Sequence, residues 1–440
     1  MFGYYLALAL RSLRRNPVLT GLMVLSIAVG IGAAMTTLTV MRLLSGDPLP
    51  GRSGQIFYPQ VDASPGEKPK RNPYDMLDYT SAMDLWRAKR ADRQALVVES
   101  QVKLQAPQSG QPPLMTQMLA THADFFPMFA VPFAHGSGWS AEDDARHARV
   151  AVISHDLNVK LFGGHDSVGQ MLRVRDGDVR IVGVLAPWRP SPLFYRVAGG
   201  KFSQGDTADF YGRTQDVFLP FETGLELNDG HFNQFTCWGM PEVPGHLQNT
   251  PCVWLQLWVQ LDTPAKVASY RRFVADYAAQ QQALGRVRQP QLARVLSLMD
   301  WLDENRVVPR DARLQTWFAL AFLAICLFNT VGLLLAKFLR RGGEIGVRRA
   351  LGASKGAIFA QCLAEAAVIG LAGGIGGLLL TLIGVGLIRG QPVAYADLVH
   401  LDVPMFLLTF ALALFASIVA GLLPALRASR IAPAMQLKAL

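Results

Sequence analysis

The sequence predicts an integral membrane α-helical protein with four transmembrane helices and a large mixed α+β domain inserted between helices 1 and 2. Composition is the first reason: hydrophobic residues make up 51% of the 440 positions and charged residues only 17%. The second is run length, because four apolar runs each reach the ~20 residues that a helix needs to cross a bilayer. The stretch between the first and second runs has a soluble-like composition.

The first and third of these spans each raise a question. Arg11, Arg14 and Arg15 precede the first, and a cleaved signal peptide is the competing interpretation. The apolar core is too long for such a peptide and no A-x-A site closes it, so we expect an uncleaved anchor. The third would reach roughly 50 Å against a bilayer core of about 30 Å, so it must tilt, break at its glycines or begin outside the bilayer. The predicted spans are residues 18–41, 314–336, 356–388 and 404–426.

Basic residues gather at the ends of the spans. Of a net charge of +9, residues 1–17 carry +3, residues 337–355 carry +5 and residues 427–440 carry +3, which leaves −2 elsewhere. This distribution argues against a nucleic-acid-binding patch. Lys and Arg beside a span stay in the cytoplasm. We therefore expect a bacterial inner (cytoplasmic) membrane protein with both termini cytoplasmic, and with residues 42–313 and the short loop 389–403 in the periplasm.

The periplasmic domain mixes strands and helices. Residues 148–185 predict a strand, a short helix and two strands joined by a turn at Asp176-Gly177. Residues 253–261 place an apolar side chain at every second position, which predicts a half-buried strand. Thr263-Pro264 then opens a helix that runs through Gln282. Pro, Gly and aromatic residues between positions 191 and 235 predict long loops.

Apolar residues recur at helical spacing just before the second span. They begin at Leu292 and end at Leu302, and Pro309 interrupts the pattern before Leu314. Two interpretations stay open. The segment is either a stalk that extends the second span into the periplasm or an ordinary core helix of the periplasmic domain.

The cytoplasmic loop 337–355 contains a short amphipathic helix, predicted from Glu344 to Leu351 after a break at Gly342-Gly343. Val347, Ala350 and Leu351 fall on one side of it, and Glu344, Arg348 and Arg349 fall on others. So little apolar surface cannot hold a helix by itself, so the helix needs a groove on a partner. The alternative is a loop that is basic only because of the positive-inside rule.

The string that follows Lys337 resembles the segment that identifies MacB/FtsX-type (type VII) ABC transporter permeases. In that family an E-I-G-x-R-x-A-x-G-A core precedes a helix with L-x-E-A and then a glycine cluster. Residues 148–185 are similar to the MacB-like periplasmic core domain, which has a V-x-V-I-S strand, an L-F-G helix end and an I-V-G-V strand. The matching loop and helix residues are Glu344, Ile345, Gly346, Arg348, Ala350, Gly352, Ala353, Leu363, Glu365, Ala366, Gly373 and Gly374.

The resemblance implies that the loop docks on an ABC ATPase. Glu344 would meet a cation of the ATPase, and Gly346 and Gly352 would allow close backbone approach. ATP and Mg²⁺ would bind the ATPase, because this sequence has no G-x-x-x-x-G-K-[ST] loop and Lys355 in GASKG lacks the upstream glycine. The expected coupling residues are Glu344, Ile345, Gly346, Val347, Arg348, Arg349, Leu351 and Gly352.

No catalytic, cofactor-binding or metal-binding residues are predicted, since neither H-E-x-x-H nor G-x-S-x-G occurs. His231, Cys237, His246 and Cys252 could in principle hold zinc, but their spacing matches no familiar zinc pattern. A Cys237–Cys252 disulfide in an oxidising periplasm is the better interpretation. Cys326 and Cys362 lie inside spans and are expected to be inert packing residues.

The third span carries two further features. Gly370, Gly373, Gly374 and Gly377 give GxxxG spacing twice, which favours close helix packing over a merely flexible or kinked helix. Glu365 lies about two turns into the span, where a carboxylate is suspected of function. It is also near enough in sequence to Lys355 and Arg349 to pair with them, and this structural role is the one we expect.

These features predict a non-catalytic permease that works by mechanotransmission. We expect a dimer, with a second copy or a related permease, surrounded by membrane lipid and bound to two copies of an external ATPase. A periplasmic adaptor and an outer-membrane channel are candidate further partners. Efflux of a drug, peptide or siderophore-like molecule from the periplasm is the first choice. Lipoprotein extraction and FtsX-like control of a cell-wall hydrolase are alternatives. A membrane-anchored periplasmic enzyme is disfavoured by the missing catalytic motif.

Overall fold

The computed structural model describes residues 15–65, 72–106, 112–202, 208–241, 243 and 245–429. The chain forms two compact units, Gly46–Val307 and the remainder on either side of it, Met1–Ser45 with Val308–Leu440. Most of the predicted cytoplasmic segments 1–17 and 427–440 lies outside the described residues.

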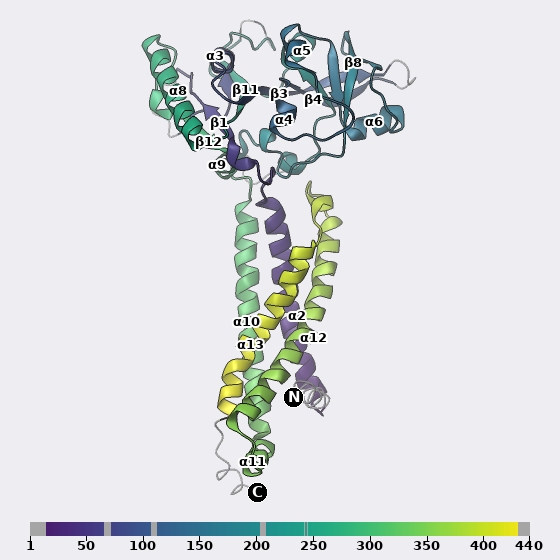
Figure 1. Ribbon diagram of the computed structural model, residues 1–440, viewed down its shortest axis with the longest axis vertical. Helices are drawn as coiled ribbons and strands as arrows, with labels where there is room; N and C mark the ends of the chain where they lie inside the picture. Colours follow the sequence, from purple (N-terminus) through teal and green to yellow (C-terminus); the bar gives the residue numbers. More distant parts are fainter. Residues whose placement is uncertain are drawn as a thin grey trace. The chain divides into compact units, whose positions relative to one another are not determined.

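Four long apolar helices build the unit that contains both ends of the chain (Figure 1). Each is long and apolar enough to cross a membrane, and each contains one of the predicted spans. α2 packs against α10 and α12, and α13 packs against the same two helices. α12 is one continuous helix of 35 residues, so the predicted third span does not break at its glycines. The helices are α2 (Pro17–Leu44), α10 (Arg310–Arg340), α12 (Lys355–Arg389) and α13 (Val403–Ser429).

Glycines bring α12 close to two neighbours. The four glycines singled out in the sequence are all buried. A Cβ on Gly373 would lie 2.6 Å from Cγ2 of Ile27 in α2, and a Cβ on Gly374 would lie 2.6 Å from Cβ of Ala413 in α13. Gly377 faces α2 and Gly370 faces α13 in the same way. The Gly370/Gly374 pair therefore contacts α13 and the Gly373/Gly377 pair contacts α2. No larger residue fits at these contacts.

The other unit is built on a mixed sheet with the strand order β12-β1-β11-β3-β4-β9-β6-β8-β5 (Figure 1). β2 and β10 also pair with β11, and β7 pairs with β3 and β8. Only the β4–β9 and β6–β8 pairs are parallel among the described strands. The first six strands are β1 (Ile56–Gln60), β2 (Leu77–Asp78), β3 (Arg93–Gln105), β4 (Leu114–Thr121), β5 (Phe133–Gly136) and β6 (Val150–Ile153). The others are β7 (Met171–Val174), β8 (Gly177–Leu185), β9 (Val217–Pro220), β10 (Thr236–Cys237), β11 (Cys252–Gln260) and β12 (Arg294–Ser297).

Seven α-helices accompany this sheet in the described residues. The longest, α8, lies at the end of the sheet formed by β1 and β12, and α6 lies at the end formed by β8 (Figure 1). They are α3 (Tyr79–Arg87), α4 (Phe125–Met128), α5 (Ala141–Ala145), α6 (His155–Phe162), α7 (Phe221–Leu227), α8 (Pro264–Ala283) and α9 (Leu298–Glu304).

The strand–helix–strand–strand prediction for residues 148–185 is confirmed by β6, α6, β7 and β8. The Ser154 side chain caps α6 by accepting a hydrogen bond from the Leu157 amide, and Gly163 ends it at φ +65. Both are local signals, since a hydroxyl satisfies an orphan amide and glycine adopts the left-handed region without cost. The predicted helix after Thr263-Pro264 is also confirmed, as α8, with Thr263 as its N-cap.

Three predictions for this unit need correction. β11 is buried at all nine positions and is not half-buried. Its apolar face lies on the main core, and Trp258 on the other face contacts Tyr58 and Trp301. The predicted long loops between 191 and 235 include β9 and α7, which are too short to stand out among turn residues.

The helical pattern from Leu292 to Leu302 is not one helix. Its first part is strand β12, which pairs with β1. A capping box at Ser297 then starts α9, which ends before Asn305. A stalk continuous with α10 is therefore wrong, and the core-helix interpretation holds only for α9, where Trp301 is fully buried.

Candidate functional site

The loop predicted to be cytoplasmic folds into a separate short helix, α11 (Gly342–Ala350), between α10 and α12 (Figure 1). The chain breaks at Arg341, one residue before the predicted glycine break. Gly352 follows the helix at φ +99, and a Cβ there would meet nothing within 4 Å. Glycine adopts this left-handed conformation without strain, and the chain reverses there after α11. The Ser354 side chain then accepts a hydrogen bond from the Ala357 amide, which starts α12.

α11 has one buried face and one exposed apolar face. Ile345 is buried in the core of the helical bundle, and Gly346 is buried beside it. Val347 is 45% exposed and Leu351 is 83% exposed, and Ala350 between them is also exposed. We call Val347, Ala350 and Leu351 the apolar face. It is the face that the sequence predicts, and nothing in the described chain covers it.

A chain of alternating charges ties α11 to the bundle. Arg15, before α2, pairs with Glu344, and Arg341 Nε lies 3.9 Å from the same carboxylate. Arg341 Nη1 also donates to Glu365 Oε1 at 3.0 Å, and Lys337 Nζ lies 3.2 Å from Glu365 Oε2. These five residues are the charge network. It joins α10, α11, α12 and the start of α2.

The network corrects two expectations. The sequence predicts that Glu365 pairs with Lys355 and Arg349, but its partners are Lys337 and Arg341. Lys355 is ten residues away on the same helix, roughly 15 Å along its axis, whereas the end of α10 packs beside Glu365. Glu344 does not point only towards a partner protein, because Arg15 and Arg341 already engage it.

The remaining predicted coupling residues lie on the sides of α11. Arg348 Nη1 donates to Gln361 Oε1 of α12 at 2.9 Å, a second tie between the two helices. Arg349 is partly exposed. The predicted coupling residues therefore fall into two groups. Glu344, Ile345 and Arg348 hold α11 on the bundle, and Val347 and Leu351 form an exposed apolar surface. Lys337 and Arg341 complete the site but lack a sequence signal beyond their positive charge.

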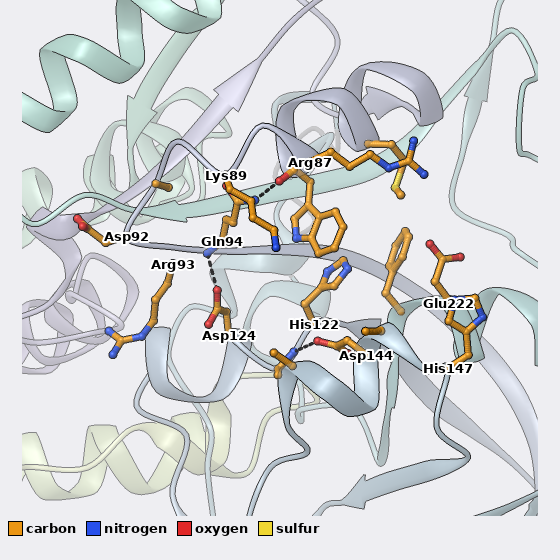
Figure 2. Close-up of a pocket in the computed structure, with 17 residues that line it drawn as sticks. Arg87, Lys89, Asp92, Arg93, Gln94, His122, Asp124, Asp144, His147 and Glu222 are labelled. Carbon is orange, nitrogen blue, oxygen red and sulfur yellow. Dashed lines mark hydrogen bonds between the residues drawn. The ribbon is translucent and has the colours of Figure 1, made fainter.

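The sheet unit contains a cavity of about 430 Å³ that the sequence does not reveal (Figure 2). In Figure 2, Lys89 and Gln94 lie on one side of it and His122 and Asp144 on the other. The His122 ring stacks between Trp86, with ring centroids 4.1 Å apart, and Phe221, at 5.0 Å. Its Nδ1 accepts a hydrogen bond from the Leu96 amide at 3.2 Å.

Burial shifts the acid–base behaviour of this cavity. It lowers the pKa of His122 to about 3, so the ring is neutral at physiological pH. Burial raises the pKa of Asp144 to about 6, and the nearby Asp124 charge adds to that shift. Asp144 accepts hydrogen bonds from the Ala123 amide at 2.7 Å and the Trp139 indole at 2.8 Å. These bonds give both groups a structural role in the cavity wall.

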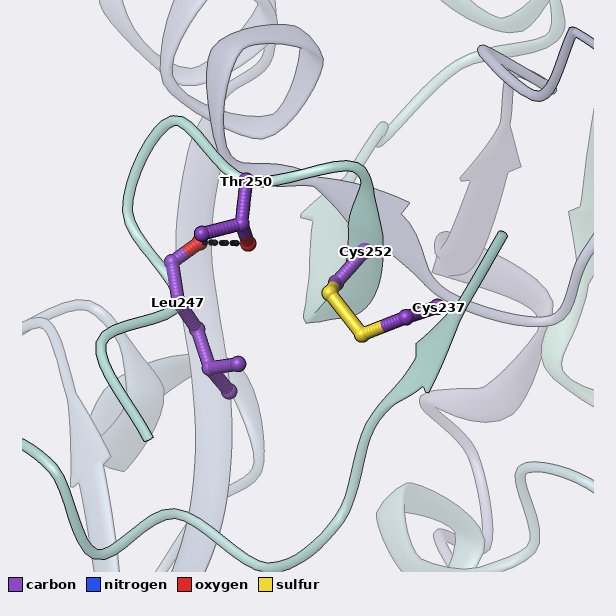
Figure 3. The surroundings of a disulfide bond; sticks show 4 residues. All are labelled: Cys237, Leu247, Thr250 and Cys252. Atoms are coloured by element: carbon purple, nitrogen blue, oxygen red, sulfur yellow. Dashed lines mark hydrogen bonds between the residues drawn. A yellow bond between two sulfur atoms is a disulfide. The ribbon is translucent and has the colours of Figure 1, made fainter. Parts of the chain in front are cut away.

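The predicted cysteine pair lies on adjacent strands. Cys237 of β10 is directly opposite Cys252 of β11, and the two are joined by a disulfide (Figure 3). His246 Nδ1 instead lies 2.7 Å from Asp229 Oδ2, and His231 Nδ1 lies 2.7 Å from the Asp229 carbonyl. No group of three or more metal-binding side chains occurs in the described residues. Cys326 and Cys362 are free and buried in the helical bundle.

Two family models match the chain. The MacB-like periplasmic core domain matches residues 20–276, and the FtsX-like permease C-terminal domain matches residues 316–433. The first match covers more than half of the sequence.

Similar proteins include fused ATP-binding/permease proteins. The macrolide export ATP-binding/permease protein MacB of Azoarcus sp. is 26% identical over 309 residues, which are 70% of this chain and 40% of that protein. The pyoverdine export ATP-binding/permease protein PvdT of Pseudomonas entomophila is 25% identical over 321 residues, 70% of this chain and 41% of that protein. The chain therefore spans about two fifths of the length of these curated relatives.

A solved structure also resembles the chain. The periplasmic region of MacB from Actinobacillus actinomycetemcomitans aligns with 12% identity and a TM-score of 0.35, covering 58% of this chain and 96% of that one.

Proposed function

The chain belongs to the family of permeases that carry a MacB-like periplasmic core domain and an FtsX-like C-terminal domain, and on that premise we propose that it couples an ABC-type ATPase to movement of its periplasmic domain. Members of this family are ABC transporter permeases, and the two matched domains are non-catalytic. We propose that α11 receives the motion of the ATPase and that the cargo is a small exported molecule.

The apolar face of α11 carries the proposal. Val347 and Leu351 are large aliphatic side chains that stay exposed on a nine-residue helix. Exposed aliphatic residues on a short helix that is fixed from behind are the surface that an amphipathic helix offers to a groove. The charge network and Ile345 hold the opposite side on the bundle. A push on the apolar face is therefore transmitted to α10, α12 and the start of α2.

The charges support an orientation. Arg15, the last residues of α10, α11 and the first residue of α12 lie at one end of the bundle, and together they carry most of the basic residues that flank the described helices. By the positive-inside rule this end faces the cytoplasm. We therefore propose that residues 46–307 lie in the periplasm of an inner-membrane protein, inserted between the first and second spans.

The proposed cargo reaches the protein from the periplasm. The buried hydroxyls of the described spans, such as those of Thr39, Thr330 and Thr381, donate to carbonyls four residues earlier in their own helices. They offer no polar path across the bundle. We propose export of a drug, peptide or siderophore-like molecule by a dimer of permeases with two ATPases. Macrolide and pyoverdine export are the activities named for the two relatives above.

A matched pair of substitutions tests the apolar face. Val347→Asp places a carboxylate in the proposed contact, while Val159→Asp places one on α6, at a valine that is 47% exposed against 45% for Val347. Burial of an uncompensated charge costs several kcal/mol. We expect at least about tenfold weaker co-purification of the ATPase with Val347→Asp and no change with Val159→Asp.

The readouts are the amount of a P-loop ATPase retained by the tagged chain and its turnover in the reconstituted complex. Wild-type retention and turnover in Val347→Asp would refute the coupling role. Equal loss in both variants would show that the effect is a general consequence of added charge.

A further inference from the structure

A second cavity, of about 330 Å³, lies at the basic end of the bundle, where α2 begins and α10 ends. Lys337 and Arg340 line it from α10, and Asn16, Val18 and Leu22 line it from the start of α2. α10 has 31 residues, about 46 Å, and the bilayer core is only about 30 Å thick. The ends of such a helix reach the level of the lipid headgroups.

The cavity is positively charged. The charge network holds three cations and two carboxylates, and Arg340 adds a fourth cation, so two positive charges are in excess. Within the described part of the chain, Arg340 has no ion pair. Lys337 is only 1% exposed, and its ammonium has one carboxylate neighbour and makes no hydrogen bond of good geometry. An anion in this cavity would meet the exposed guanidinium of Arg340, with the buried ammonium of Lys337 behind it.

The start of α2 adds to the attraction. Asn16 is the N-cap residue, but its side chain makes no capping hydrogen bond, and Pro17 is the first helical residue. Pro17 has no amide N–H and the Thr20 amide donates to the Asn16 carbonyl at 3.1 Å, so the Val18 and Leu19 amides are the ones without a partner inside the helix. Because these residues line the cavity, the positive end of a 28-residue helix lies beside the two cations.

An apolar stripe leads away from the cavity along α2. Val18 is 76% exposed, Leu22 52%, Leu25 57% and Val29 37%. The spacing of four, three and four residues places these side chains on one side of the helix. The stripe begins inside the cavity, with Val18 and Leu22, and continues towards the middle of the span for about three turns.

We propose that this cavity binds the phosphodiester headgroup of an anionic phospholipid, with one acyl chain lying along the stripe from Val18 to Val29. The phosphate would contact the Arg340 guanidinium and the Val18 and Leu19 amides, and the buried Lys337 ammonium would add positive charge behind them. Basic pockets between transmembrane helices on the cytoplasmic side bind such headgroups for this reason. The inference needs only that the four helices span a bilayer. It does not depend on the coupling role of α11.

The test uses the purified chain, stripped of lipid in a neutral detergent, with phosphatidylglycerol as the probe. Native mass spectrometry counts the lipids that each chain retains. We expect retention of phosphatidylglycerol but not of zwitterionic phosphatidylcholine. Arg340→Gln should weaken it about fivefold, the value of one cation near an anionic headgroup. Lys355→Gln, which removes an exposed cation outside the cavity, should leave it unchanged.

Two further arms separate a lipid from a free anion. Leu22→Asn leaves the cations in place and should also weaken phosphatidylglycerol, because it interrupts the stripe. Inorganic phosphate should compete only at far higher concentration than the lipid. The proposal is overturned if Arg340→Gln and Lys355→Gln weaken retention equally, if phosphate competes as well as the lipid, or if no phosphatidylglycerol is retained because a second copy covers the cavity.

Discussion

The two units of the molecule treat a buried carboxylate differently. Glu99 in β3 and Glu365 in α12 each have a side chain that is 2% exposed, and each pairs with an arginine, Arg196 at 3.1 Å and Arg341 at 3.0 Å. The second oxygen of Glu99 accepts from the neutral Gln215 amide at 2.9 Å. Glu99 therefore has a charged partner on one oxygen and a neutral partner on the other.

Glu365 instead meets two cations, and one of them leads on to the exposed helix α11. Its cluster is open and carries excess positive charge. A glutamate–arginine pair can therefore fix a loop on a sheet in one unit and connect an exposed helix to the spans in the other. What differs is whether the second partner is neutral or charged.

Removal of each carboxylate gives the largest expected effect. Glu365→Ala and Glu99→Ala both leave a buried cation unpaired, which costs roughly 3–5 kcal/mol. We expect both to lower the unfolding midpoint of the purified chain in detergent. Glutamine keeps the shape of the side chain and removes its charge, so the two Gln variants compare the functions of the two clusters. Glu365→Gln should reduce ATP-driven turnover, and Glu99→Gln should not. Identical turnover in the two Gln variants would remove the functional distinction between the Glu365 and Glu99 clusters.

The disulfide of the sheet unit comes next. It closes a loop of 15 residues, for which the chain-entropy model gives about 3 kcal/mol. Cys237→Ser with Cys252→Ser should destabilise the sheet unit by that amount, while Cys326→Ser in the bundle should change little. Mass mapping of unreduced peptides checks the bond directly, and two free thiols there would contradict it.

Glycine contacts test the bundle itself. Gly370→Ala would bring a Cβ within 2.0 Å of Ser417 Cβ, whereas Gly386 on the same helix has nothing within 4 Å. Overpacking costs about 1–3 kcal/mol. We therefore expect Gly370→Ala to lower the melting temperature and Gly386→Ala to leave it unchanged or raise it. The opposite order would show that α12 and α13 do not pack closely.

How much of this could be predicted from sequence depends on whether a signal is local. The four spans follow from run length, and α6 follows from Ser154 and Gly163, which are adjacent to the helix that they delimit. The partners of Glu365 could not be predicted, because they depend on how α10 packs beside α12. The cavity around His122 could not be predicted either, since its walls come from segments far apart in the chain. The burial of both faces of β11 required knowledge of the aromatic cluster around Trp258.

The smallest expected effect is on the pH dependence of stability, through the opposed titrations of Asp144 and His122 in the cavity of the sheet unit. The raised pKa of Asp144 contributes stability that is present below pH ~4 and is lost as pH rises through about 6. The lowered pKa of His122 contributes stability that is present above pH ~6.5 and is lost as pH falls towards 3. The two slopes oppose each other between pH 4 and 6.

Asp144→Asn should therefore make stability rise more steeply with pH across this window, by roughly 1–2 kcal/mol, and His122→Gln should make it fall. Urea denaturation at pH 4.5, 5.5 and 6.5, extrapolated linearly to zero urea, measures the free energy of unfolding of both variants. Parallel pH profiles for the two variants would contradict the assignment.

The accessibility of position 351 tests the central claim most directly. Leu351→Cys, with Cys326 and Cys362 replaced by Ser, should react with an impermeant maleimide in inside-out vesicles and be protected when the ATPase is bound. Val159→Cys in the same background should react only from the outside of intact spheroplasts, with or without the ATPase. Labelling of Leu351→Cys that the ATPase does not reduce, or that occurs from the same side as Val159→Cys, would contradict a cytoplasmic coupling helix.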